Sequence, residues 1–399
     1  MFIKNASVQG TLQDIEIDGG RIKAISPSGR RKTTADSDVD ANGNMVIVGF
    51  ADSHMHLDKS MLALRAEYED VVASEKGRLT REQKAKLTEE DIYQNARMVI
   101  QRAIANGTIA IRTNVDVDPL VELRGVRALL RLREEFKEIL NLQVIPIAQE
   151  GVYNYPKTPA LLRQALDLGS DGVGGHTIID NDGQGHIDTI LEIAKEYDVT
   201  CDLHVDESGK REHFLLPYLA QKTIEFGLQG RVNGVHACTL AALDEKTVKE
   251  TLAISKEAGL RFMVAPTAIS TRNLTITKEL VAAGFPVTLG SDNVGDFFNP
   301  LGGAHALHVA VLLAYVHRYF TKSERRTVLE MVSSGANGLF HRELGDEGIT
   351  VGAPADITII DGANPREVLS RVGAPWLVVR NGRIISRREE HLAFGLFDG

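Results

Sequence analysis

Val46-Ile47-Val48-Gly49-Phe50 is an apolar run that leads directly into Ala51-Asp52-Ser53-His54-Met55-His56-Leu57-Asp58-Lys59. In an extended chain, side chains alternate between two faces, so residues two positions apart point the same way. If the run is a strand, His54 and His56 can therefore reach one metal ion together. Taken alone, the pair fits two solvated or capped histidines equally well, and the rest of the chain must decide.

The composition is that of an ordinary soluble globular protein. The chain has 399 residues, 43% hydrophobic and 25% charged, which is long enough for one large barrel and an accessory domain. Its 45 Lys and Arg against 54 Asp and Glu give a net charge of -9, which argues against nucleic acid or an acidic membrane as the main partner. With only two cysteines and no stretch as long as a membrane span, we expect a cytoplasmic protein.

Both ends of the chain show short strands joined by tight turns. The first 45 residues alternate apolar runs with turns such as Asp18-Gly19-Gly20, and similar runs lie at 356–362 and 376–385. In both ends a turn precedes an Arg-Ile strand, which predicts that the termini meet in one small β-sandwich domain. We expect its two parts at residues 1–48 and 346–399, with a barrel domain at 49–345.

Between the ends, apolar runs alternate with segments of helical spacing. The helical spacing is clearest at 92–103, behind a Thr88 cap and before Asn106-Gly107. The runs lie at 108–117, 142–148, 199–205, 231–236, 260–265 and 286–291. With the His54 strand and a short one near 172–175, they make about eight units, which predicts an α/β fold with a (β/α)8 barrel of the TIM type. The polar segment 65–90 has no matching strand and is either a lid or a solvated helical hairpin.

Polar residues close several of these apolar runs, at the strand ends where such barrels carry their chemistry. Besides the first pair, they are His204, with Glu207 three positions later, His236 and Asp292. Imidazole and carboxylate suit a divalent ion such as zinc or ferrous iron, and an open coordination position makes the ion catalytic. Glu207 has the chemistry to carry a proton from a metal-bound water to a leaving amine, or is a plain surface carboxylate.

The chain resembles the amidohydrolase superfamily, in particular the branch of the cytosine deaminases and the N-alkylaminohydrolases of triazine breakdown. The resemblance covers nearly the whole chain and rests on several motifs in the expected order. They are His54-Met55-His56-Leu57-Asp58, Arg112-Thr113-Asn114, Gln149-Glu150-Gly151, His204-Val205-Asp206-Glu207, His236, Ser291-Asp292-Asn293 and Gly352-Ala353-Pro354-Ala355-Asp356.

The resemblance implies a role for each matching position. One metal ion would be held by His54, His56, His204 and Asp292. Catalysis would fall to Glu207 as the proton shuttle, to His236 as a hydrogen-bonding partner of the metal-bound water or of the substrate, and to Asp292. Gln149 matches a residue that reads the amide edge of a pyrimidine.

The end of the fourth predicted strand indicates one metal ion rather than two. Binuclear relatives bridge their metals with a carboxylated lysine from that strand, whereas here it ends Gly174-Gly175-His176. We therefore expect one Zn²⁺ or Fe²⁺ per subunit. His176 either faces the substrate or is a hydrogen-bonded structural histidine, and Lys59 lies at the pocket rim or in an ion pair.

Two positions depart from the cytosine deaminase pattern. Asn293 replaces a second aspartate that contacts the base, and Asn114 replaces a histidine in the expected pocket wall. An amide both donates and accepts hydrogen bonds, whereas a carboxylate only accepts them, so the substrate expected at Asn293 differs from cytosine.

These observations lead to one principal hypothesis and two alternatives. The principal one is a metal-dependent deaminase that hydrolyses ammonia or an alkylamine from a small nitrogen heterocycle. The alternatives are a hydrolase of a ring C–N bond in a cyclic amide or imide, and a metal-bearing binding protein without turnover. We further expect a homo-oligomer with a small heterocyclic substrate and no nucleic-acid or membrane partner.

Overall fold

A computed structural model describes residues 1–29, 35, 37–64, 71–72, 74–340 and 348–389 of the chain. Part of the predicted lid or hairpin at 65–90 therefore lies outside the described residues. The described part of that segment contains helix α1 (Lys76–Lys84).

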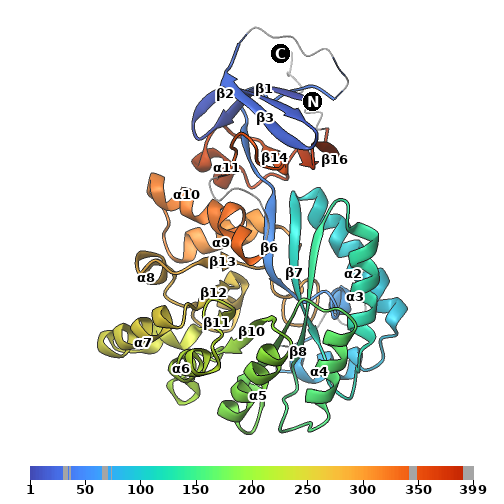
Figure 1. The fold of residues 1–399 in the computed structure, drawn as a ribbon, viewed down its shortest axis with the longest axis vertical. Coiled ribbons are helices and arrows are strands. Elements are labelled where there is room, and N and C mark those ends of the chain that lie inside the picture. Colours follow the sequence, from blue (N-terminus) through green and yellow to red (C-terminus); the bar gives the residue numbers. More distant parts are fainter. Residues whose placement is uncertain (30–34, 36, 65–70, 73, 341–347, 390–399) are drawn as a thin grey trace, which may run out of the picture.

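Eight parallel strands form the barrel in the order of the sequence (Figure 1). They are β6 (Phe50–Met55), β7 (Thr108–Asp116), β8 (Asn141–Ala148), β9 (Gly172–His176), β10 (Thr200–Val205), β11 (Val232–His236), β12 (Arg261–Val264) and β13 (Val287–Leu289). A bridge between Met55 and Asp292 brings the end of the last strand back to the first. The predicted (β/α)8 barrel is confirmed.

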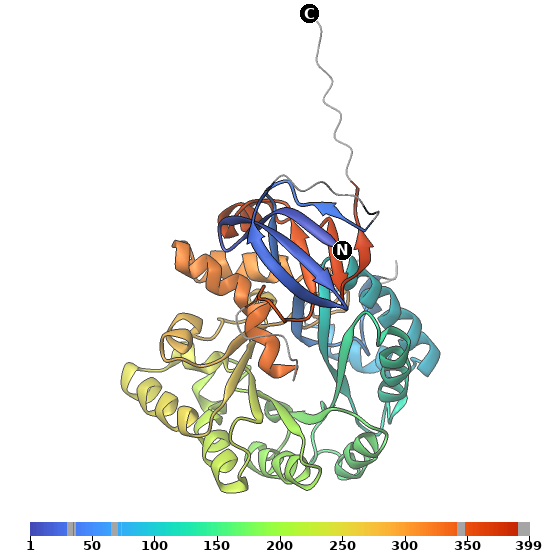
Figure 2. The same cartoon turned by 45° about the horizontal axis from the view of Figure 1, so that its top comes forward.

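Helices surround the barrel strands (Figure 2). They are α2 (Glu89–Ala105), α3 (Arg124–Phe136), α4 (Thr158–Asp167), α5 (Gly183–Glu196), α6 (Leu216–Phe226), α7 (Glu245–Glu257), α8 (Thr277–Ala282), α9 (Ala306–Val316) and α10 (Lys322–Met331). Helix α2 begins at the predicted Thr88 cap, where Thr88 and Asp91 satisfy each other's backbone N–H groups. Its buried face includes Ala96, Val99 and Ile100, which join the main apolar core as their spacing predicted. None of the helices in the described part is long and apolar enough to cross a bilayer.

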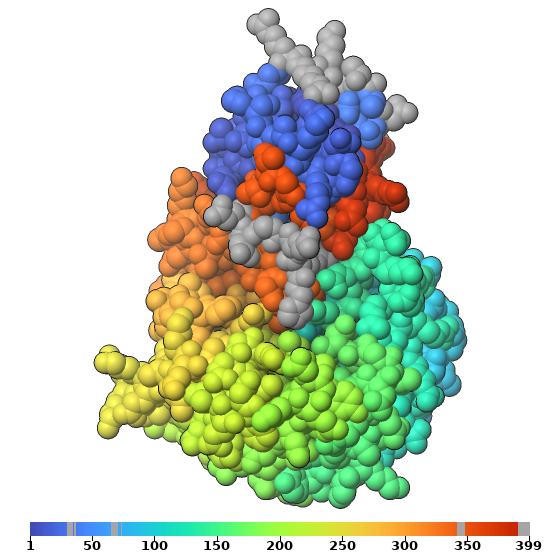
Figure 3. Space-filling view, in the orientation of Figure 1, coloured from blue at the N-terminus to red at the C-terminus, as the bar shows by residue number. Residues whose placement is uncertain are grey.

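The two chain ends share a second, mixed sheet. Its strands are β1 (Phe2–Val8), β2 (Thr11–Asp18), β3 (Arg21–Pro27), β4 (Val39–Asp40), β5 (Met45–Val48), β14 (Ile357–Ile360), β15 (Leu377–Arg380) and β16 (Arg383–Arg387), with α11 (Pro365–Arg371) after β14. Antiparallel pairing of β14 with β5 sets Ile359 opposite Val46 and joins the two ends. They form one body above the barrel, blue and red in Figure 3, as predicted for a small β domain built from both termini.

Gly49 lies between the last strand of the first segment, β5, and the first barrel strand, β6. A Cβ at Gly49 would lie 2.6 Å from Cδ1 of Ile109 on β7, closer than carbon atoms approach. Glycine therefore lets the chain pass from the small domain into the barrel at close contact with β7. This passage places His54 at the carboxyl end of the first barrel strand.

Candidate metal and catalytic site

Five side chains predicted as metal ligands or catalytic groups meet at the carboxyl ends of the barrel strands. His54 lies on β6 with His56 just after it, His204 lies on β10, His236 ends β11, and Asp292 follows β13. All five are buried. The structure thus brings together residues that are more than 200 positions apart, because parallel strands end at the same edge of the barrel.

Backbone hydrogen bonds hold Asp292 between the two histidines of the first strand. The N–H of Asp292 donates to the carbonyl oxygen of His54 at 2.8 Å, and the N–H of His56 donates to the carbonyl oxygen of Asp292 at 2.9 Å. Asp292 has a φ of 60°, a left-handed conformation that is strained for a residue with a side chain and is often found at functional sites.

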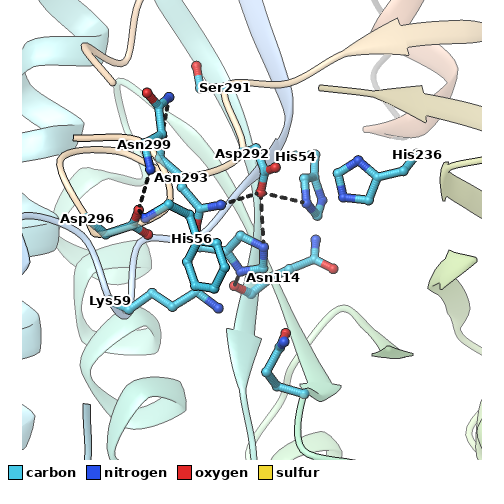
Figure 4. Close-up of polar contacts among 12 residues, drawn as sticks. His54, His56, Lys59, Asn114, His236, Ser291, Asp292, Asn293, Asp296 and Asn299 are labelled. Carbon is cyan, nitrogen blue, oxygen red and sulfur yellow. Dashed lines mark hydrogen bonds and ion pairs between the residues drawn. The ribbon is translucent and has the colours of Figure 1, made fainter. Parts of the chain in front are cut away.

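The side chains of these residues converge as well (Figure 4). Nε2 of His54 and Nε2 of His56 lie 3.5 and 3.3 Å from Oδ1 of Asp292. His54, His56 and His204 each offer a nitrogen within 4.8 Å of the others, and His54, His236 and Asp292 form a second such group. His54 belongs to both groups, so the four predicted ligands and His236 lie around one region of the site.

The chemistry of these groups fits a divalent metal ion. Among the described residues, neither ring nitrogen of His54 or of His204 makes a hydrogen bond, although buried polar atoms normally do. Burial lowers the pKa of His236 and of His56 to about 4 and that of His204 well below its usual value, so these rings are neutral at pH 7. Buried imidazoles next to a carboxylate are the donors that zinc and ferrous iron accept.

His56 is oriented by the neighbouring strand. Its Nδ1 lies 3.0 Å from the backbone carbonyl oxygen of Asn114, so Nδ1–H donates and Nε2 stays free for a ligand. The Asn114 side chain points into the barrel interior, where its amide lies 3.4 Å from Asp202, and it does not line the pocket. The prediction that Asn114 forms part of the pocket wall was wrong, because the side chain follows the interior-facing pleat of β7.

Glu207 lies between two histidines and an arginine. Its Oε2 is 2.7 Å from His176 Nε2, and its Oε1 is 2.5 Å from Arg272 Nη2 and 3.9 Å from His236 Nε2. Burial raises the pKa of this carboxyl, but His236, His176 and Arg272 outweigh burial and hold the pKa well below its usual range. Only 17% of the side chain is exposed, so Glu207 is a half-buried carboxylate of the site rather than a surface residue.

Arg272 was not identified from the sequence. It follows β12 and the short 3-10 turn Pro266–Ser270, and 18% of its side chain is exposed. The only available signal was an arginine in the loop after a barrel strand, which is weak because arginines are common in loops. Its pairing with a residue 65 positions away became visible only in the folded chain.

Gln149 and His176 form a hydrogen-bonded pair in the pocket. Nε2 of Gln149 donates to Nδ1 of His176 at 2.9 Å. Since an amide nitrogen only donates, Nδ1 is the acceptor, and the proton sits on Nε2, which faces Glu207. His176 was interpreted either as facing the substrate or as a hydrogen-bonded structural histidine. It combines features of both, since it lines the pocket and is also held by the hydrogen bond from Gln149.

Asp180 fixes the loop that follows Gln149. Its carboxylate accepts three successive backbone N–H groups at 152–154 and lies 2.8 Å from His186 Nδ1. Burial raises the pKa of Asp180, but His186 and the backbone amides outweigh it and lower the pKa to about 2. The ionised form therefore stabilises the fold above the ordinary carboxyl pKa, and this contribution is lost as the pH falls toward 2.

We expect Asp180→Asn to lower the free energy of unfolding at pH 7 by about 1–2 kcal/mol, allowing for solvent screening. Urea unfolding measures the loss, and the difference from wild type should shrink as the pH is lowered below 4. The control is Asp167→Asn, an exposed carboxylate that accepts the Tyr197 hydroxyl and no other group in the described part of the chain. Equal stability of the two variants would contradict the assigned role of Asp180.

Asn293 supports Asp292 and keeps an acceptor free. Its Nδ2 donates to Oδ1 of Asp292 at 3.1 Å, whereas its own Oδ1 has no partner in the described part of the chain (Figure 4). The residue lines the same pocket as the histidines. An aspartate at this position could not donate to Asp292, so the amide adds support to Asp292 and offers a ligand a neutral acceptor instead of a charged one.

The pocket has a volume of about 280 Å³, enough for a small ring compound. The predicted groups line its inner part, including His56, His204, His236 and Asp292. Lys59, Lys76, Arg272 and Phe298 also line it. A larger cavity of about 960 Å³ lies between the small domain and α10 and contains none of these groups.

A buried charge network joins α1 to the ends of β7 and β8. Nζ of Lys84 lies 2.9 Å from Asp116, 3.0 Å from Asp118 and 2.9 Å from Glu150. Nζ of Lys59 lies 2.9 Å from the other oxygen of Asp116, so the predicted ion pair of Lys59 is present. Because Lys84 is buried, the described part of the 65–90 segment is attached to the barrel and is not a solvated hairpin.

A model of the amidohydrolase family matches residues 96–386. The chain belongs to the amidohydrolase family. N-isopropylammelide isopropyl amidohydrolase of Pseudomonas sp. (strain ADP) is 32% identical to this amidohydrolase, over 98% of each chain. Pterin deaminase of Rhizobium rhizogenes (strain K84 / ATCC BAA-868) is 27% identical, over 94% of this chain and 88% of the relative.

Solved structures agree with the sequence relatives. The crystal structure of 5-methylcytosine deaminase from Klebsiella pneumoniae liganded with 5-fluorocytosine matches this amidohydrolase with a TM-score of 0.90 and 27% identity, over 99% of each chain. The resemblance predicted from the motifs is thus confirmed, including the branch of deaminases and N-alkylaminohydrolases.

Proposed function

We propose that this protein is a metal-dependent aminohydrolase that releases ammonia or an alkylamine from a small nitrogen heterocycle. The observation that carries the proposal is the convergence of the buried imidazoles of His54 and His56 on Asp292, with His204 beside them and the ionised Glu207 nearby. Relatives support the substrate class, since they are named for isopropylammelide, a pterin and 5-methylcytosine. Asn293 offers a ligand a neutral acceptor in place of a carboxylate, which supports a ring other than cytosine.

We propose that His54, His56, His204 and Asp292 hold one divalent ion, zinc or ferrous iron. When bound, such an ion lowers the pKa of a water molecule toward neutrality. Glu207 accepts a proton from the attacking water and passes it to the leaving nitrogen. His236 donates a hydrogen bond to the oxygen that replaces the amine, and Gln149, Asn293 and His176 orient the ring. A C–O bond forms, the C–N bond breaks, and the ring stays intact.

The domain limits 1–48, 49–345 and 346–399 belong to the same proposal, as do a homo-oligomeric state and a cytoplasmic location. Strand β5 ends at Val48 and β6 begins at Phe50, which supports the first of these limits. Size-exclusion chromatography with light scattering would test the oligomeric state.

A turnover screen tests the reaction. The zinc- or iron-loaded protein is incubated with aminopyrimidines, aminopurines, pterins, creatinine-like rings and N-alkylaminotriazines, and released amine and product mass are measured. We expect release of ammonia or alkylamine with an intact ring for at least one class. Ring opening without a released amine would replace the proposal by cyclic amide hydrolysis, and binding without turnover would indicate a binding protein.

A further inference from the structure

Lys76 places a positive charge in the pocket, and none of the carboxylates in the described part of the chain forms an ion pair with it. It is the first residue of α1, lies half-buried, and lines the same pocket as the candidate metal ligands. Its Nζ lies 5.2 Å from the ring centroid of Phe298, another lining residue, an arrangement typical of a cation over an aromatic face. Within the described ranges, Glu207 and Asp296 act on Lys76 only through longer-range Coulomb attraction.

The other cationic side chains that line the pocket are already neutralised. Lys59 pairs with Asp116, and Arg272 pairs with Glu207. Lys76 is therefore the surplus cation among the lining residues that the structure describes. Partial burial and the nearby Arg272 lower the pKa of Lys76, so its charged form is less well stabilised than in water and would gain from an anionic partner.

The position of Lys76 is set by the opposite end of its helix. Lys84, at the carboxyl end of α1, is buried among Asp116, Asp118 and Glu150. The two lysines are eight positions apart along the helix, a span of about 12 Å. Helix α1 is thus fixed at its Lys84 end, next to Glu150, and this fixed helix holds Lys76 at the wall of the pocket.

We propose that Lys76 binds a negatively charged oxygen of the substrate, either a ring oxyanion or a carboxylate substituent. The inference rests on the proposed function for the reaction itself and narrows its substrate class to anionic heterocycles. Lys76 would act as a specificity-determining residue, because a neutral ring of the same size leaves its charge without a partner.

Binding of three pyrimidines to the zinc-loaded protein tests the proposal without requiring turnover. Uracil is neutral at pH 7, barbiturate is a ring anion, and orotate carries a carboxylate. Isothermal titration calorimetry should show one or both anions binding about 10- to 100-fold more tightly than uracil, as expected for a charge-assisted hydrogen bond. The anion that carries the preference identifies which of the two oxygen sources is recognised.

Two variants and a control assign the preference to Lys76. Lys76→Met should remove most of the preference with little change in uracil binding, whereas Lys76→Arg should keep it. Lys86→Met, an exposed lysine beyond the other end of α1, should behave as wild type. Circular dichroism and zinc content check that each variant is folded and loaded.

Several outcomes would overturn the proposal. They are uracil binding as tightly as both anions, no binding of either anion by the wild-type protein, or an unchanged anion preference in Lys76→Met. An unchanged preference in Lys76→Met would mean that the anion binds to the metal or to another cationic side chain. A failed amine-release screen would reject the proposed reaction and leave the binding result standing, so the two failures are distinguishable.

Discussion

Glu207→Gln should retain the metal and lose turnover by about 100- to 10,000-fold, the range typical for removal of a general acid–base group. Glutamine has nearly the shape of glutamate, but its amide cannot take a proton from water and pass it to a leaving amine. The carboxylate is ionised and lies within 3.9 Å of His236, in position for that transfer. Amine release and metal content per chain are the two measurements.

The control for this variant is Glu212→Gln. Glu212 follows in the same loop and lies in the exposed turn Arg211–His213, where the same change should leave turnover within about twofold of wild type. Turnover of Glu207→Gln within tenfold of wild type would reject the proton-shuttle role. A fall in its metal content would instead assign Glu207 to metal binding.

His54→Gln should abolish metal binding while leaving the metal-free fold nearly as stable as wild type. Neither ring nitrogen of His54 makes a hydrogen bond in the described structure, so the substitution removes no structural hydrogen bond. In the described part of the chain, Nε2 of His54 lies 3.5 Å from Oδ1 of Asp292, so a bound ion would take both groups as ligands and its loss should be nearly complete. We expect less than about a tenth of an ion per chain and no measurable amine release.

Thermal unfolding distinguishes a lost metal site from a damaged fold. Zinc at 100 times its dissociation constant should stabilise the wild-type protein by about 2.7 kcal/mol and should not stabilise His54→Gln. His317→Gln is the control, because His317 lies half-buried outside the site and contacts the Thr277 hydroxyl. If His54→Gln kept both metal and zinc-dependent stabilisation, His54 would not be a ligand.

The strands and their order could be predicted because the information is local. Alternating apolar runs, the Thr88 cap and glycine punctuation each act over a few residues, and β7, β8, β10 and α2 lie within a few residues of the expected ranges. The prediction that the candidate metal ligands lie together required one further rule. Parallel barrel strands end on one edge, so a polar residue that closes an apolar run must face the same site as the others.

The remaining site residues depend on where side chains point after folding. Arg272 reaches Glu207 across 65 positions, and Lys84 reaches Glu150 across 66, contacts that no local pattern encodes. Asn114 also shows that side-chain direction could not be predicted from the sequence. Its position on β7 was predicted, but its side chain turned toward Asp202 in the barrel interior rather than to the pocket.

By itself, the sequence determined that this chain forms a barrel with a terminal β domain and that His54, His56, His204, His236 and Asp292 share one edge. These features follow from periodicity and from the geometry of parallel strands. Only the tertiary structure decided three further properties. They are the lowered pKa of Glu207, the ion pairs of the cations that line the pocket, and the position of Lys76 in the pocket wall. Those properties depend on distances and burial between segments far apart in the chain, because electrostatic interactions are strong only at close approach inside the protein.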